Sequence, residues 1–365
     1  AKKLFDYSTL DLKQFLPGAF VRYNGKFHKV SDPFRRPQDL LTSIGTPIGS
    51  FVDKAKVGIF SLLIRFKALD DIFGQPELDT LSYLKRTQGL SPSMIDRFFS
   101  PFYQGIFLSP LKYQSSRMFE FVFKMFTEGA AALPAGGMQN ICTQVANCLP
   151  SGNLQLNTKV FSAKDGRIEA FNGATGKKER WSCESVVLAV DPPTASKLTG
   201  GKVEIPDARK STCLYYGFDG PPPITEPLLI LNGENAFDDF EPASTTINNI
   251  CFPSSVSSKY APEGKSLASV TVVGSADGVS DSELETSIRQ QLEDWFGVET
   301  TATWKFLKSY RVLYAQPAQT PPYSIEGAPI RLTESLLICG DHRGTATLNG
   351  AIESGRRAAQ CLLES

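Results

Sequence analysis

Residues 335–365 carry the clearest pattern of apolar and polar positions in the chain. Residues 336–339 form an apolar run that ends at Gly340 and Asp341, which predicts a short buried strand of a parallel sheet. After a loop of small residues, apolar or small residues recur at helical spacing from Leu348 onward. The pattern predicts a strand, a tight loop and a helix. Asp341 then lies beside the unpaired amide groups of the first helical turn, and such a crevice suits a ligand with electron-rich oxygens.

Two stretches near the N-terminus also predict regular elements. Apolar runs on both sides of Asn24-Gly25, within residues 18–30, predict a β-hairpin with a type I′ turn. Residues 47–50 are typical of a helix start. The helix that follows has apolar positions at Phe51, Ala55, Val57, Ile59, Leu62, Leu63 and Phe66.

Residues 79–126 are rich in aromatic side chains and predict a set of short helices, with breaks at Gly89, Pro101 and Pro110. The last of these helices, residues 118–126, is apolar almost all round. Such a helix is either buried in the core or faces a cavity for a bulky apolar substrate. Both alternatives stay open at the level of sequence.

The rest of the chain mixes strands and helices. Residues 154–190 predict three small strands followed by a buried strand, and residues 206–330 predict further strands separated by turn residues. Ser280 and Glu283 form a capping box that predicts the start of a helix. Together these patterns predict the α/β fold class, with an additional α+β part.

The charge balance of the chain limits its partners. The 38 basic residues equal the 38 acidic residues, so no overall field attracts nucleic acid or an anionic membrane. We therefore expect a small-molecule substrate and no nucleic-acid partner. No stretch approaches the roughly 20 apolar residues that a transmembrane helix needs, which leaves only peripheral membrane contact open.

The seven cysteines are odd in number and contain no CxxC pair, so we expect free, mostly buried thiols. Such thiols are typical of a reducing compartment, which predicts an intracellular location in the cytoplasm or a plastid. The two histidines, His28 and His342, are too few for a histidine-rich metal cluster, and no metal site is predicted. We expect His342 to be a solvated loop residue; the alternative is a place beside the bound ligand.

The motifs of the closing segment are Gly340-Asp341 and the run from Gly350 to Gly355, which reads Gly-Ala-Ile-Glu-Ser-Gly. In order and spacing they resemble the closing segment of the flavin-containing amine oxidoreductase superfamily, which includes amine oxidases, protoporphyrinogen oxidases and phytoene-desaturase-like enzymes. The run Leu133 to Met138 resembles the place where this family re-enters its FAD domain. The resemblance implies an FAD-dependent oxidoreductase.

The resemblance also implies two interleaved domains. One is a partial FAD/NAD(P)-binding, Rossmann-like domain at residues 129–205 and 321–365. The other is a substrate domain, with a hairpin and helices at residues 1–128 and a sheet at residues 206–320.

The expected FAD contacts follow from the same resemblance. They include the backbone at Val160 and the residues of the closing motifs, namely Gly340, Asp341, Leu348, Asn349, Gly350 and Ala351. The missing side chains of Gly350 and Gly355 are expected to let the backbone approach a flat ligand on one side and the sheet on the other. Catalytic residues cannot be assigned; the aromatic candidates are Tyr310, Tyr314 and Tyr323. Gln316 departs from the family pattern, which weakens the expected flavin contact there.

The family normally begins with a Gly-x-Gly-x-x-Gly turn that holds the pyrophosphate of FAD. No such turn occurs in these 365 residues. We therefore expect an N-terminally incomplete chain whose FAD binding is impaired.

The expected reaction is removal of a hydride from a C–N or C–C bond of a small, lipophilic substrate, such as an isoprenoid or an amine. The alternative is a non-catalytic remnant of the family that binds no flavin. Motifs of other enzyme classes, such as GxSxG, GxxxxGK[ST] and HExxH, are absent from the sequence.

Overall fold

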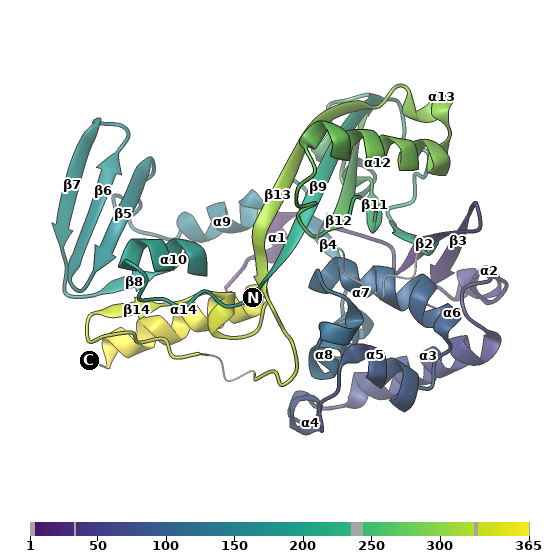
Figure 1. Ribbon diagram of the computed structural model, residues 1–365, viewed down its shortest axis with the longest axis horizontal. Helices are drawn as coiled ribbons and strands as arrows, with labels where there is room; N and C mark the ends of the chain where they lie inside the picture. The colour runs from purple at the N-terminus through teal and green to yellow at the C-terminus, as the bar shows by residue number, and fades with distance from the viewer. Residues whose placement is uncertain (1–3, 33, 235–243, 325–327, 365) are drawn as a thin grey trace.

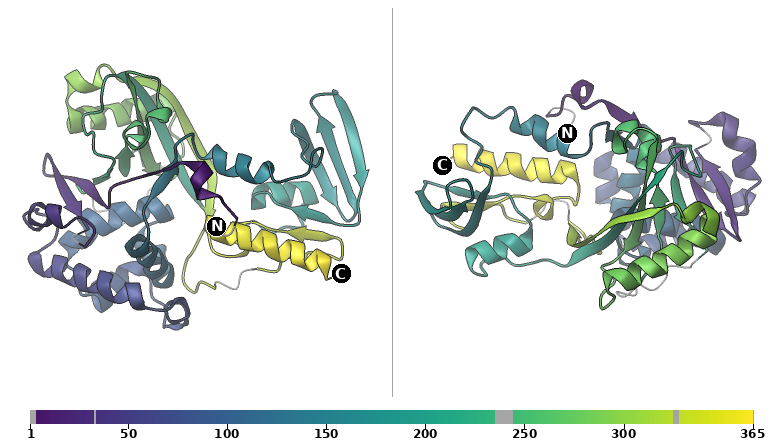
Figure 2. Two further views of the ribbon diagram at one scale, coloured as in Figure 1. Left: turned by 180° about the vertical axis from the view of Figure 1, so that it is seen from behind. Right: turned by 90° about the horizontal axis from the view of Figure 1, so that it is seen from above.

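The computed structural model describes residues 4–32, 34–234, 244–324 and 328–364. The chain forms two lobes (Figure 1). The larger lobe contains a seven-stranded sheet and most of the helices, and the smaller lobe contains shorter strands and the C-terminal helix. Two long strands, β9 (Ala208–Asp219) and β13 (Lys305–Pro317), run in opposite directions between the sheet of the larger lobe and the smaller lobe, as both views in Figure 2 show.

The seven-stranded sheet has the order β13-β9-β12-β11-β10-β2-β3. Its neighbouring strands are antiparallel, except that β10 and β2 are parallel. The remaining strands of this sheet are β2 (Gly18–Tyr23), β3 (Lys26–Ser31), β10 (Leu229–Asn232), β11 (Asn249–Cys251) and β12 (Lys265–Val273). Outside it, β1 (Leu12–Gln14) pairs with β4 (Ala132–Pro134).

The hairpin predicted at residues 18–30 is confirmed, because β2 and β3 pair around Asn24 and Gly25. Both turn residues have positive φ, 50° and 72°. A type I′ turn requires this conformation at its two central positions, and asparagine and glycine adopt it with little strain. The local sequence therefore determines the turn and the register.

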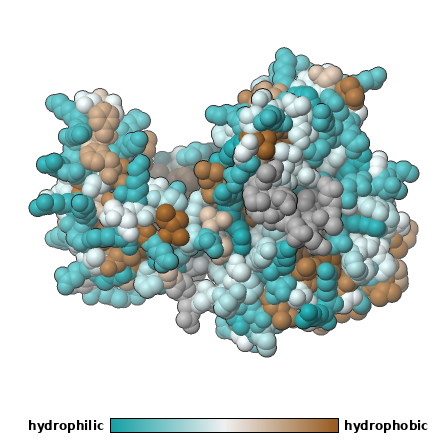
Figure 3. All heavy atoms as spheres, viewed as in Figure 1, coloured by the Kyte–Doolittle hydropathy of each residue, from teal (hydrophilic) through white to brown (hydrophobic). Residues whose placement is uncertain are grey.

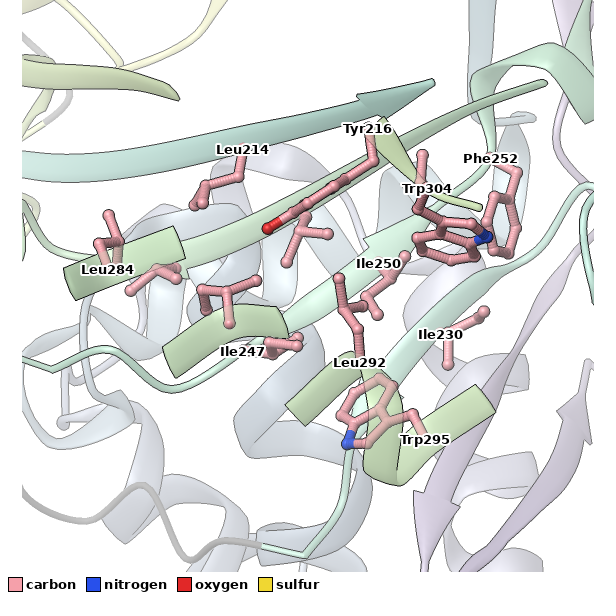
Figure 4. Packing of buried hydrophobic residues seen from close by; sticks show 14 of the residues in the cluster. Leu214, Tyr216, Ile230, Ile247, Ile250, Phe252, Leu284, Leu292, Trp295 and Trp304 are labelled. Atoms are coloured by element: carbon pink, nitrogen blue, oxygen red, sulfur yellow. The ribbon is translucent and has the colours of Figure 1, made fainter. Parts of the chain in front are cut away.

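One face of the large sheet is covered by helix α12 (Asp281–Phe296). Alternate residues of β9, such as Leu214 and Tyr216, point to this face, and Leu284 and Leu292 of α12 pack on them (Figure 4). The predicted capping box is confirmed at the helix start. Ser280 N–H donates to a Glu283 carboxylate oxygen at 2.9 Å, and the Ser280 side chain accepts from Glu283 N–H.

Further helices form a helical region, part of which contacts the other side of the sheet. They are α2 (Leu40–Ile44), α3 (Phe51–Phe66), α4 (Leu69–Gly74), α5 (Thr80–Ser82), α6 (Pro92–Met94), α7 (Ser100–Phe107) and α8 (Ser116–Glu128), with π-helical turns η2 (Tyr83–Thr87) and η3 (Ile95–Phe99). Helix α7 packs closely on the sheet at Gly105, where an added Cβ would lie 2.6 Å from the side-chain amide nitrogen of Asn249. The break predicted at Pro101 is wrong. Pro101 lies in the first turn of α7, where a missing N–H is tolerated.

The helical region has an aromatic core. Its buried members include Phe60, Phe99, Tyr103 and Phe119, whose ring centroids lie 4.6 to 6.4 Å from those of neighbouring rings. Both alternatives for residues 118–126 hold in part, because α8 places Phe119 in this core while Phe126 lines a cavity.

Helix α3 departs from the expectation for an ordinary amphipathic helix. Its buried side is built from Phe60, Ile64 and the half-buried Val57. Six of the seven predicted apolar positions lie instead on the opposite side and are exposed, with Val57 as the exception. An apolar pattern at helical spacing reports the period of a helix but not which of two apolar sides faces the core.

The smaller lobe contains an antiparallel sheet of β5 (Thr158–Lys164), β6 (Arg167–Asn172) and β7 (Lys177–Ser182), followed by β8 (Val186–Leu188). This order confirms the three small strands and the buried strand predicted for residues 154–190. Strand β8 pairs in parallel with β14 (Leu336–Ile338). The helices of this lobe are α9 (Gln139–Ala146), α10 (Pro192–Thr199) and α14 (Leu348–Leu363).

The cysteines are all free thiols, but the expectation that most are buried is wrong. Only Cys339, next to β14, is buried; Cys142 and Cys148 are exposed and the other four are partly exposed. A cysteine count indicates pairing capacity but carries no periodicity from which burial could be predicted.

A pH-dependent contribution to stability is expected at the start of α3. The Asp53 side chain is buried, which raises its pKa, but hydrogen bonds from Ser50 and Ser91 outweigh this effect and lower the pKa to about 2. Asp53→Asn should therefore lower the free energy of unfolding by about 1 to 3 kcal/mol at neutral pH. The stabilisation by the carboxylate is present above pH ~4 and is lost as the pH falls toward 2. Denaturant unfolding from pH 7 to pH 2 should show the difference from wild type shrinking at acidic pH.

The matched control is Asp71→Asn, which changes an exposed aspartate on α4. It should leave the free energy of unfolding within about 0.5 kcal/mol of wild type. Equal effects of the two changes would contradict the assignment.

Candidate active site

Strand β14 ends at the place where the crevice was predicted. Its three residues are fully buried, and both of its edges are paired. On one edge, Val186 N–H donates to the carbonyl oxygen of Ser335 at 2.8 Å, and on the other, Ile338 N–H donates to that of Ile330 at 2.9 Å. The strand predicted at residues 336–339 is confirmed, with Gly340 directly at its carboxyl end.

Ser354 fixes helix α14 to the end of this strand. Its hydroxyl accepts a hydrogen bond from Gly340 N–H and lies 2.8 Å from the carbonyl oxygens of Gly340 and Ala351. The side chain is buried, so these hydrogen bonds are not shared with solvent. A serine at this place in the closing motif thus has a structural role that the motif alone did not reveal.

Gly350 makes room for the preceding loop, because an added Cβ would lie 1.9 Å from the carbonyl oxygen of Thr345. The expected approach of a flat ligand to Gly350 stays a prediction. Gly350 N–H donates to the hydroxyl of Thr347, which caps the helix. At Gly355 nothing lies within 4 Å of an added Cβ, so the expected close approach to the sheet is wrong.

Six of the seven predicted cofactor residues come together at the junction of β14, the short 3₁₀ helix η6 (Asp341–Arg343) and α14. They are Gly340, Asp341, Leu348, Asn349, Gly350 and Ala351. Val160 lies instead on β5, in the three-stranded sheet, paired with Ala170. Its side chain is partly exposed, and its predicted contact with FAD stays a prediction.

Three buried polar atoms around this junction have no hydrogen-bond partner among the residues that the structure describes. They are Tyr314 Oη at the end of β13, and His342 Nε2 and Arg343 Nε in η6. The prediction of a solvated His342 is wrong: its side chain is only 2% exposed, because Asp341 and Gly340 fold the loop around the ring. Buried polar groups of this kind are normally satisfied, so each of these atoms points to a missing partner.

The two tyrosines near η6 are held in the neutral form. Burial raises the pKa of Tyr323 to about 12, and the nearby carboxylate of Asp341 adds to the shift. Burial, with Asp341 and Asp191, also raises the pKa of Tyr314. Tyr323 Oη donates to the carbonyl oxygen of Gly344 at 3.1 Å. Both phenols therefore keep their proton at neutral pH and can act as hydrogen-bond donors.

Tyr310, the third aromatic candidate, lies farther along β13. It is half exposed and packs edge-on against Tyr215 on β9. This ring contact lies within the large sheet and not at the junction. Gln316 uses its side-chain amide to donate to the carbonyl oxygen of Ile106 on α7 at 2.9 Å. This contact joins β13 to the helical region.

An apolar cavity of about 390 Å³ lies among α2, α3, α7 and α8. Its lining includes Phe98, Phe102, Tyr103, Phe123 and Phe126, and its volume is within the range of small-molecule sites. Helix α7 lies between this cavity and β13. Its residues Phe102 and Tyr103 line the cavity, and Ile106, about one turn later, contacts Gln316.

The junction residues fit the flavin end of FAD. The unpartnered donors of Tyr314 and Arg343 and the N-terminus of a 16-residue helix suit a ring system that carries acceptor atoms, and the unpartnered His342 Nε2 can donate or accept beside it. A search of family profiles agrees with this reading: the profile described as flavin containing amine oxidoreductase matches residues 2–363. The chain belongs to this family.

No curated protein sequence matches the chain. Among solved structures, a protein named as a protoporphyrinogen oxidase from Exiguobacterium sp. 255-15 is 16% identical with a TM-score of 0.65, covering 97% of this chain and 82% of that chain. Putrescine oxidase bound to putrescine is 12% identical with a TM-score of 0.60, covering 98% and 84%. Reduced UDP-galactopyranose mutase is 14% identical with a TM-score of 0.58, covering 97% and 79%. These likenesses show that the chain has the fold of flavin-dependent family members.

The two glycines of the closing helix should respond differently to the same substitution. Gly350→Ala would force its new methyl group against the backbone of Thr345, so it should shift the loop and abolish flavin binding. Gly355→Ala meets no atom and should raise helix stability by up to about 1 kcal/mol. Flavin titration and thermal unfolding of both variants provide the measurement. Similar behaviour of the two variants would contradict the assigned role of Gly350.

Proposed function

We propose that the protein acts in an FAD-dependent oxidation that removes a hydride from a C–N or C–C bond of a lipophilic small molecule. The family supplies the flavin chemistry. The lipophilic substrate class is supported by one observation, the aromatic-lined cavity in the helical region. A cavity with this lining gains free energy by removing apolar surface from water, at about 25 cal/mol per Å².

The connection through α7 supports a long substrate. Phe102 and Tyr103 line the cavity, and the next turn of the same helix contacts β13 through Gln316. Two residues before Gln316, Tyr314 borders the junction where the flavin would bind. We propose that the apolar part of the substrate occupies the cavity and that its reactive end extends past α7 toward Tyr314.

The chain's own residues bind and orient in this proposal. When bound, the flavin supplies a hydride acceptor. Arg343 and His342 would donate hydrogen bonds to it from η6, and burial at this place excludes water. Tyr314 stays protonated at neutral pH and can place an uncharged donor beside the reacting centre, whereas the Tyr323 hydroxyl donates its hydrogen bond to the carbonyl oxygen of Gly344.

Residues 1–365 alone should bind FAD weakly. The contacts of the junction serve the flavin end, and the sequence contains no Gly-x-Gly-x-x-Gly turn for the pyrophosphate. Each missing charge-assisted hydrogen bond costs roughly 1.5 to 3 kcal/mol. Fluorescence titration should therefore give similar dissociation constants for FAD and FMN, both weaker than about 1 µM. FAD binding tighter than this, with FMN binding far weaker, would show that another segment holds the pyrophosphate.

A non-catalytic member of the family is the second candidate, because the sequence lacks that turn. Mixing the FAD-loaded protein with a substrate in the absence of oxygen distinguishes the oxidoreductase from the non-catalytic candidate. With saturating FAD, a long-chain amine or an isoprenoid should bleach the flavin absorption if the protein is an oxidoreductase. A well-folded protein that takes up neither FAD nor FMN would leave only the non-catalytic candidate.

A substitution that fills the cavity should test the substrate class without disturbing the fold. Gly58 of α3 lines the cavity, and an added Cβ there meets no atom within 4 Å. Gly58→Phe should therefore weaken binding of a fluorescent polyene fatty acid at least tenfold. Gly74→Phe, at an equally open glycine outside the cavity, should leave this binding unchanged. If both variants bind like wild type, the cavity does not hold the lipophilic ligand.

The location of the protein is a further proposal. Two of the free thiols are exposed, and exposed thiols persist where the surroundings are reducing. This supports an intracellular compartment, either the cytoplasm or a plastid.

A further inference from the structure

Two hydroxyl groups in the lining of the apolar cavity have no hydrogen-bond partner among the described residues. The other polar side chains of the lining each form a local hydrogen bond with another group of the chain. These side chains are Ser31, Asp32, Arg35, Ser43, Lys54 and Thr127. The two hydroxyls that remain belong to Ser61 of α3 and Tyr103 of α7.

Tyr103 is the buried one of the two. Only 2% of the residue is exposed, and its ring centroid lies 4.7 to 6.0 Å from those of Phe99, Phe107 and Phe119. In contrast to the three buried atoms at the junction, its hydroxyl oxygen is not completely covered by protein atoms, so it borders the cavity that the residue lines. Ser61 is partly exposed, and water can satisfy its hydroxyl.

The hydroxyl of Tyr103 keeps its proton. Burial alone raises its pKa well above the usual value of a phenol. Tyr83, in the same aromatic core, differs in that its hydroxyl donates to the carboxylate of Glu120 and accepts from the side-chain amide of Gln88 at 2.8 Å. Buried tyrosine hydroxyls normally have such a partner. Tyr103 is therefore an uncharged donor whose partner is missing.

A water molecule is a poor partner for this hydroxyl. A water in a protein interior needs several hydrogen bonds, and an empty cavity with apolar walls stays dry. The cavity beside Tyr103 has aromatic walls, which include Phe102, whose ring centroid lies 5.1 Å from that of Tyr103, and Phe123. A water there would bind Tyr103 and would have its other hydrogen bonds unmade. A ligand that is apolar except for one acceptor atom fits this arrangement better.

Such a ligand can reach the cavity from the surface. Leu40 of α2 and Phe51 of α3 line the cavity and are 39% and 68% exposed, so they border its mouth. Figure 3 shows apolar surface at the lower right, where Figure 1 places these two helices. None of the described helices is long and apolar enough to cross a membrane. An apolar molecule thus enters through an apolar opening and meets a buried donor at Tyr103.

We propose that Tyr103 determines the substrate class by donating a hydrogen bond to a carbonyl oxygen of the molecule in the cavity. This inference rests on the proposed function and narrows its substrate to a lipophilic carbonyl compound, such as a ketone, a quinone or an ester. A carbonyl group fits better than a hydroxyl group, because it brings no donor of its own that would need a buried acceptor. A hydrocarbon would leave the Tyr103 hydroxyl buried and unpaired, which weakens binding.

Displacement of the fluorescent polyene fatty acid by matched ligands tests this inference. Benzophenone and diphenylmethane are similar in size, but only benzophenone has a carbonyl group. Deoxybenzoin and bibenzyl form a second pair, with the carbonyl group at a different place. Tyr103→Phe removes only the hydroxyl. It should weaken binding of one or both ketones at least about fivefold, the effect of one neutral hydrogen bond, and should leave both hydrocarbons within about twofold of wild type.

Thermal unfolding separates this role from a structural one. Tyr103→Phe should keep or raise the unfolding midpoint, because no hydrogen bond within the chain is lost. Tyr83→Phe is the matched control: it removes the hydroxyl that is bonded to Glu120, so it should lower the midpoint and leave ketone binding unchanged. Ser61→Ala should also leave ketone binding unchanged, because this hydroxyl is partly exposed.

Three outcomes would overturn the inference. If Ser61→Ala loses ketone binding and Tyr103→Phe does not, the donor is Ser61. If Tyr103→Phe binds both ketones like wild type while Gly58→Phe still blocks them, the cavity holds a lipophilic ligand as proposed, but Tyr103 does not select it. If none of the four ligands displaces the fatty acid from wild type, the inference is wrong together with the proposed use of the cavity.

Discussion

The antiparallel pairing of β9 with β13 is the contact on which the rest of the structure depends. The two strands pair from Lys305 and Gly217 in the large sheet to Pro317 and Ala208 near the smaller lobe. One end of the pair is anchored by the aromatic core beneath α12, and the other end places Tyr314 beside η6. The pairing has register shifts between Phe306 and Lys308 and between Val312 and Gln316, and the two strands connect the packed core of the larger lobe to the stretch of β13 that carries Tyr314.

The candidate site itself is held by small polar residues. Ser354 joins the helix to the strand, Thr347 caps the helix, and Gly350 gives the loop room to pass. These contacts leave His342 Nε2 and Arg343 Nε buried without a partner among the described residues. A rigid frame with unpaired donors is the arrangement expected for binding a rigid, acceptor-rich ring, since no reorganisation is needed on binding.

Apolar side chains of the same types occupy three different places in the helical region. Phe60 and Phe119 stabilise the fold by packing in the core, whereas Phe102 and Phe126 line the cavity and Phe66 faces solvent. These different places become visible only when position is added to composition.

The sequence by itself determined the features that depend on residues close together in the chain. Asn24-Gly25 specified the hairpin, Ser280 and Glu283 specified the start of α12, and the closing motifs specified the strand, loop and helix, because turns and caps are made by neighbours. The family resemblance rested on the same local motifs.

Only the tertiary structure decided which side of an element is buried and what each loop residue contacts. In the structure, the side of α3 that the apolar pattern predicted for the core is exposed, and the His342 side chain is buried. Gly350 lies against the backbone of Thr345, which leaves no room for a side chain. The reason is that burial depends on which distant elements pack against a residue. Contacts between residues far apart in the chain leave no periodic mark in the sequence around either partner.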